Sequence, residues 1–181
     1  MKHAYYLPIF LILAAFLLRV FRHFGIIDLP PNFAPIGAMA LFSGAVFTSR
    51  RVAFLLPLIA MVASDFFIGW YDARILIAVY GSFLLSVVLG LYVQKRPSIA
   101  KIFCSAIASS VMFFLITNAA VWLFSEMYPI TFSGLGNAYL MGLPFLKWTI
   151  AGDIFYTGIL FGLYYFILAF VCKTRHATVI H

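Results

Sequence analysis

Residues 52–70, VAFLLPLIAMVASDFFIGW, form an apolar run with a single charged side chain, Asp65. A hydrocarbon core about 30 Å thick takes about 20 helical residues to cross. The run therefore predicts a membrane-spanning helix. A second run, residues 148–171, has the same character and carries Asp153. A carboxylate inside a membrane span is costly, so both acids are candidates for a functional role.

The composition extends this reading to the whole chain. Of the 181 residues, 65% are hydrophobic and 9% are charged, and the mean hydropathy is +1.09. Such a chain has too little polar surface for a soluble domain. We predict one all-α integral membrane domain over residues 1–181, because no polar stretch is long enough to fold separately. The net charge of +7 does not indicate nucleic acid, since Lys and Arg flank the apolar runs and read as topology determinants.

Six spans are expected, which makes the predicted fold a bundle of six transmembrane helices in the lipid bilayer. The first reads as a retained anchor helix, because Arg19 and Arg22 close it and no small-x-small cleavage site follows. The second is short for a bilayer, which suggests a helix that is partly unwound or sunk within the bundle. The expected spans cover residues 5–20, 35–47, 52–70, 75–92, 101–124 and 148–171.

The distribution of basic residues predicts cytoplasmic termini. Most Lys and Arg fall on the side that holds both chain ends: Lys2, Arg50, Arg51, Lys95, Arg96, Lys101, Lys173 and Arg175. The side with more basic residues is cytoplasmic. Loops 21–34, 71–74 and 125–147 then face outward. Cys104 and Cys172 both fall near cytoplasmic helix ends, so a disulfide framework is not indicated.

Four spans each carry a polar residue near the outer side: Asp65, Tyr80, Asn118 and Asp153. From the rise of 1.5 Å per residue, all four are expected at one depth, about 8 to 9 Å below the outer boundary. The inner halves of the spans are almost purely apolar, which favours a cavity open to the outside. Structural roles remain open for these residues: the acids can pair with Arg74, Lys147 or backbone donors, and Asn118 can bridge helices. The candidate substrate-binding residues are Asn32, Asp65, Tyr80, Asn118, Asp153 and Tyr156.

The outer loop at residues 125–147 has its own pattern. Thr131 or Ser133 is able to cap a short apolar helix from Leu135 to Leu143, which Gly and Pro residues flank. We consider two roles for this helix: a lid over the cavity, or an interfacial helix lying flat on the membrane.

Catalytic chemistry is not indicated. The four histidines, His3, His23, His176 and His181, all lie outside the expected spans, and the chain has no phosphate-binding loop. Two acids without a nucleophile or metal ligands leave most hydrolytic mechanisms incomplete. We therefore expect no enzyme activity, no bound metal and no cofactor.

Five segments of the chain form a recognisable set: PNFAPIGAMALFSG (31–44), LLPLIAMVASD (55–65), TNAAVW (117–122), YP (128–129) and GDIFYT (152–157). Together they resemble a group of uncharacterised bacterial membrane proteins over residues 28–171. That group is similar to the S-components, the substrate-binding subunits of energy-coupling factor vitamin transporters.

The resemblance implies a protein of the bacterial cytoplasmic membrane that captures a vitamin-like small molecule outside and delivers it inward. Delivery would use an energy-coupling transmembrane subunit with ATPases, or the protein would act alone, as in relatives associated with cobalamin uptake. The small-x-x-x-small motif that docks the coupling subunit in S-components is missing from span one, which has only Ala14-Ala15. Two alternatives remain: an accessory subunit of a larger membrane complex, and an ion-coupled permease that uses the two acids.

Overall fold

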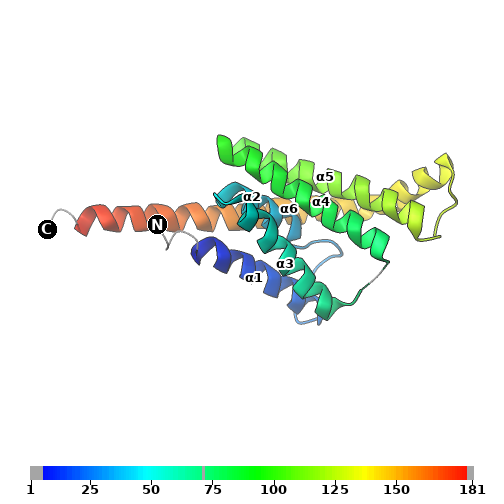
Figure 1. The fold of residues 1–181 in the computed structure, drawn as a ribbon, viewed down its shortest axis with the longest axis horizontal. Coiled ribbons are helices and arrows are strands. Elements are labelled where there is room, and N and C mark those ends of the chain that lie inside the picture. Colours follow the sequence, from blue (N-terminus) through cyan, green and yellow to red (C-terminus); the bar gives the residue numbers. More distant parts are fainter. Residues whose placement is uncertain (1–5, 71, 179–181) are drawn as a thin grey trace.

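The computed structural model describes the backbone of residues 6–70 and 72–178, with side chains through residue 170. This part of the chain is all-helical, with no strand. Five of its helices are long and apolar enough to cross a membrane. The helices are α1 (Tyr6–His23), α2 (Ile36–Val46), α3 (Arg50–Ile68), α4 (Ala73–Lys95), α5 (Ile99–Phe124) and α6 (Phe132–Thr178). The start of α1 and the end of α6 lie at the same end of the molecule (Figure 1).

The short helix α2 lies at the centre of the bundle. Every residue from Gly37 to Gly44 is buried. Phe42 packs edge-on against Phe161 and Tyr164 of α6, and the Ser43 hydroxyl donates to the Ala53 carbonyl of α3. The prediction that the second apolar run is sunk within the bundle is therefore confirmed.

Helix α2 covers only part of the bundle's length. Its eleven residues span about 16 Å, whereas the nineteen residues of α3 span about 28 Å. Only residues 47–49 separate α2 from α3, so the C-terminus of α2 lies level with the start of α3. The N-terminus of α2 therefore lies midway along the bundle, and the non-helical residues 24–35 descend to it from the end of α1 (Figure 1).

Side chains from other helices satisfy backbone groups at both ends of α2. The Ala38 N–H in its first turn donates to Asp153 of α6, and the Gln94 amide of α4 donates to the Phe47 carbonyl. Free backbone groups at helix ends cost free energy when no water reaches them. These two contacts explain how so short a helix is stable inside the bundle.

Helix α6 begins much earlier than predicted. It starts at Phe132, sixteen residues before Trp148, and continues through Gly142 and Pro144 without a break. The prediction of a separate lid or interfacial helix at Leu135–Leu143 was therefore wrong. Thr131 does cap the helix, since its hydroxyl accepts from the Gly134 N–H at 3.1 Å, as predicted. This first part of α6 packs on the end of α5, where the Tyr139 hydroxyl donates to the Leu115 carbonyl.

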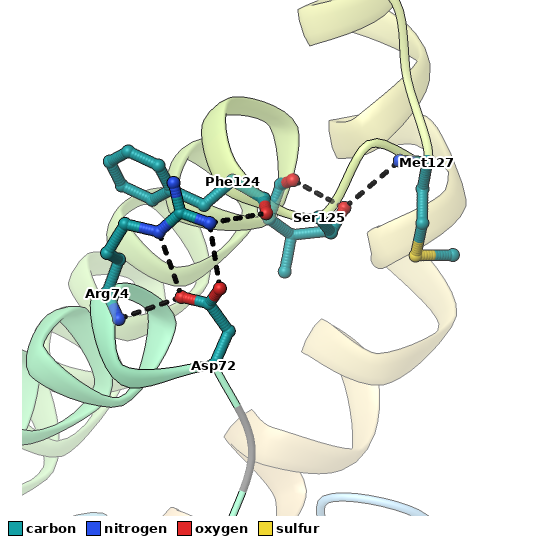
Figure 2. Close-up of polar contacts among 6 residues, drawn as sticks. Asp72, Arg74, Phe124, Ser125 and Met127 are labelled. Carbon is teal, nitrogen blue, oxygen red and sulfur yellow. Dashed lines mark hydrogen bonds and ion pairs between the residues drawn. The ribbon is translucent and has the colours of Figure 1, made fainter.

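An ion pair between Asp72 and Arg74 lies at the start of α4 (Figure 2). The Asp72 carboxylate accepts from the Arg74 N–H at 2.8 Å and pairs with the guanidinium at 2.8 Å. These contacts lower the pKa of Asp72 from 3.8 to about 2, the side-chain hydrogen bond being the largest cause. A depressed pKa means that the contact stabilises the fold above pH 3.8 and is lost as the pH falls through about 2. Arg74 also lies over the Phe124 ring, which joins α4 to the end of α5.

Candidate functional site

The two buried acids lie in different surroundings. Asp65 on α3 is 1% exposed. One of its oxygens lies 2.6 Å from the Arg19 guanidinium of α1, and the other accepts from the Tyr80 hydroxyl of α4 at 2.6 Å. Arg19 also donates to the neighbouring Ser64 hydroxyl. Asp65 therefore joins three helices and has a matching positive charge.

Asp153 on α6 is 3% exposed and has no basic partner among the described residues. Its Oδ1 accepts from the Ala38 N–H at 3.1 Å, and its Oδ2 accepts from the Ser110 hydroxyl of α5 at 2.6 Å. The N-terminus of a helix carries a partial positive charge. The start of α2 is thus the main electrostatic partner of this carboxylate.

Two glycines permit the close approach of the α2 entry to α6. A Cβ atom on Gly37 would lie 2.5 and 2.6 Å from the two carboxylate oxygens of Asp153. A Cβ atom on Gly152 would lie 3.1 Å from the Ala34 backbone nitrogen. Tyr156, one turn after Gly152, packs its ring against Phe33 with centroids 5.4 Å apart. The approach to α2 is therefore held against one face of α6.

Three cavities meet at Asn32, in the segment that descends to α2. Asn32 has a φ of +63°, a left-handed conformation that Asn tolerates better than most residues. The first cavity, of about 70 Å³, extends to Asp153 and Ser109. The second, of about 260 Å³, extends between α5 and α6 to Asn118. The third, of about 360 Å³, extends to Arg19, Arg22 and His23.

The first and second cavities share three lining residues, Asn32, Phe113 and Thr149, and so lie next to each other. The phenyl rings of Phe113, Phe114 and Phe145 supply much of its wall. The polar groups around the larger part come from Asn32, Thr117, Asn118 and Thr149. A mostly apolar wall with a few polar groups is typical of small-molecule sites. We call these two adjoining cavities together the Asn32 cavity.

The structure divides the six predicted site residues into two sets. Asn32, Asn118 and Asp153 line the Asn32 cavity. Asp65 and Tyr80 bind each other, and Tyr156 packs on Phe33; these three line none of the three cavities.

The prediction of one common depth is correct for Asp65 and Tyr80 but wrong for Asp153. Asp153 contacts Ser110, which lies eight residues from Asn118, or about 12 Å along α5. The cause is the early start of α6, because the predicted depth assumed that this helix begins at Trp148.

Several residues around the two buried acids, Asp65 and Asp153, were not predicted from the sequence. Arg19 was assigned to topology alone, although a basic residue in the last turns of an apolar run is a candidate partner for Asp65. The prediction of almost purely apolar inner halves was wrong as well, because α4 and α5 carry several buried serines. The serines are Ser82, Ser86, Ser105, Ser109 and Ser110. The adjacent Ser109 and Ser110 in an apolar run were the available indication.

The described residues contain no group of three or more His, Cys, Asp or Glu side chains arranged for a metal. Asp153 is the one ionisable residue of the Asn32 cavity, and a single carboxylate is a weak metal site. Cys104 is free and exposed, whereas the side chain of Cys172 lies outside the described residues.

Fold and site together define the class: over residues 6–70 and 72–178 the protein is all-α, with five helices of membrane-spanning length and hydrophobicity around a short, buried helix. The chain belongs to the family of unknown function DUF6580, whose model matches residues 1–176. No curated protein and no solved structure matches it.

Proposed function

We propose that this chain is an uptake protein of the bacterial cytoplasmic membrane that captures a compact, vitamin-like micronutrient in the Asn32 cavity. The observation that carries the proposal is the start of α2 midway along the bundle, which leaves a lined space beside it. Non-helical backbone at membrane depth is tolerated where it is buried in protein or lines a cavity. Discontinuous helices of this kind form the substrate sites of many transporters.

In the proposed orientation five helices cross the membrane, and the descending residues 24–35 together with α2 make a sixth crossing. Both termini then lie in the cytoplasm. The excess of Lys and Arg at the end that holds the α2–α3 and α4–α5 connections supports it. The Asn32 cavity then opens toward the outside, since Asn118 lies near the opposite end of α5. Lipid is the surrounding partner in this arrangement. An energy-coupling subunit with ATPases is a further partner compatible with it.

The walls of the Asn32 cavity indicate the ligand's chemistry. Three phenyl rings favour a planar or aromatic molecule, and the amides of Asn32 and Asn118 offer it a few hydrogen bonds. The volume of about 260 Å³ in the larger part lies near the lower limit of small-molecule sites. The ligand is therefore a small ring compound such as a vitamin precursor, and cobalamin is too large for this space.

Native mass spectrometry of protein purified gently from its own host tests the proposal. We expect the wild type to carry a small molecule, and Val121→Phe to lower its occupancy by about tenfold or more. The added ring occupies the cavity, and overpacking of this size costs about 1 to 3 kcal/mol. Leu123→Phe is the matched control, because Leu123 lies two residues further along α5 and is 44% exposed.

Equal occupancy in Val121→Phe and wild type would place the ligand elsewhere. If the wild type carries no bound molecule but purifies with a stoichiometric membrane partner, the protein is an accessory subunit and the uptake proposal is refuted.

A further inference from the structure

The buried carboxylate of Asp153 differs from that of Asp65 in having no cation to balance it. Asp65 lies 2.6 Å from the Arg19 guanidinium, whereas Asp153 is held only by a backbone N–H and the Ser110 hydroxyl. An ionised carboxylate in a dry interior is costly without a positive partner. Exchange of a proton is the usual way in which such a group relieves that cost.

Among the described residues, no charged group of the surrounding elements forms an ion pair with Asp153. Helix α2 contains none, and on α5 the nearest are Cys104 and Lys101, about 9 and 14 Å along the axis from Ser110. On α1, Arg19 binds Asp65 and Arg22 binds the carbonyls of Leu29 and Pro30. On α4, the Tyr80 hydroxyl donates to Asp65. Other groups on these elements include His23 at the exposed end of α1, Asp28 in the descending segment, and Lys147 and Tyr156 on α6.

The smaller part of the Asn32 cavity lies against Asp153. Its volume of about 70 Å³ has room for more than one water molecule, since a single water needs about 10 to 15 Å³. This part is lined by Asp153, Ser109 and Asn32 and adjoins the larger part, which extends to Asn118. The two adjoining parts outline a path for a proton from the Asn118 end of the bundle to the carboxylate.

We propose that Asp153 is a proton-exchange site that couples uptake to a proton gradient. A hydronium ion in the smaller cavity transfers its proton to Oδ2, which leaves water behind and forms the neutral acid. The Ser110 hydroxyl then turns from donor to acceptor. The interaction between the carboxylate and the α2 N-terminus weakens because the negative charge is gone. Release of the proton to water restores the charge and the original contacts.

The coupling to uptake rests on the proposed function, but the proton exchange does not. Difference infrared spectroscopy of the full chain in lipid nanodiscs tests the exchange with the proton alone as probe. As the pH is lowered from alkaline to mildly acidic, we expect the carbonyl band of a buried carboxylic acid to appear. Asp153→Asn should abolish this band. Glu126→Gln, which changes an exposed loop acid, should leave it unchanged.

Ser110→Ala gives a second measurement that does not depend on the folding of the Asn variant. It removes one donor to the ionised carboxylate, so the acid should form at a pH higher by about one to two units. A band that persists in Asp153→Asn, an unshifted midpoint in Ser110→Ala, or the absence of any titrating buried acid would each overturn the proposal. Native mass spectrometry for the micronutrient is independent of these results.

Discussion

Gly90→Ala should unfold or severely destabilise the protein, by about 3 kcal/mol or more. Helices α2 and α4 cross in direct backbone contact: a Cβ atom on Gly90 would lie 2.2 Å from the Leu41 carbonyl oxygen, and one on Gly44 would lie 2.1 Å from that of Val87. A backbone carbonyl oxygen in a helix cannot move away by a rotamer change, as a side chain can. The helices must therefore separate, and the packing around the crossing is lost along much of α2.

Gly81→Ala is the matched control, because it changes the same residue type on the same helix. A Cβ atom on Gly81 has no neighbouring atom within 4 Å, and alanine favours a helix by about 1 kcal/mol over glycine. We expect its stability in bicelles, measured by reversible unfolding, to equal or exceed that of the wild type. A Gly90→Ala protein as stable as Gly81→Ala would show that α2 and α4 do not cross in backbone contact.

Removal of either partner of the Arg19–Asp65 pair should cost about 3 kcal/mol of folding stability. The Asp65 side chain is 2% exposed and that of Arg19 is 18% exposed, so each substitution leaves a largely buried charge without its partner. Loss of one member of a buried pair costs about 3 to 5 kcal/mol, and the partial exposure of Arg19 favours the lower end. The double variant Arg19→Met, Asp65→Leu should lose less than either single variant, because it buries no unpaired charge.

A double-mutant cycle measured by equilibrium unfolding in bicelles provides the check. Each single variant should lose more folding stability than the double variant does. Because neither Arg19 nor Asp65 lines the Asn32 cavity, the double variant should also retain the bound micronutrient. Additive losses of stability would refute the pairing. Loss of the ligand from a stable double variant would show that Asp65 belongs to the binding site.

The helical architecture was largely predictable because its determinants are local. Apolar runs of roughly the length that crosses a bilayer predict α1, α3, α4 and α5, and the shortness of the second run indicates a buried α2. The start of α6 was not predictable in the same way. Gly142 and Pro144 are ordinary loop residues in a sequence, yet packing against α5 holds them within one helix.

The candidate site was predictable in its residue types but not in its pairings. Intramembrane acids and amides stand out in any apolar run, which identified Asp65, Asn118 and Asp153. Which cation meets Asp65 depends on the rotation and neighbours of α1, and the sequence suggested Arg74 or Lys147 instead of Arg19. Backbone donors were among the partners considered for the acids, and the Ala38 N–H at the start of α2 is such a donor to Asp153. Which residue donates depends on how far α2 enters the bundle, and no local pattern encodes that depth.

The most direct test of an outward-facing Asn32 cavity is sided cysteine labelling in intact cells. Cys104 and Cys172 are first replaced by serine, and one cysteine is introduced as Asn118→Cys in the cavity or Ser98→Cys at the start of α5. We expect a membrane-impermeant maleimide to label Asn118→Cys from outside and Ser98→Cys only after permeabilisation. Labelling of Asn118→Cys only after permeabilisation, or from neither side, would contradict the outward-facing cavity.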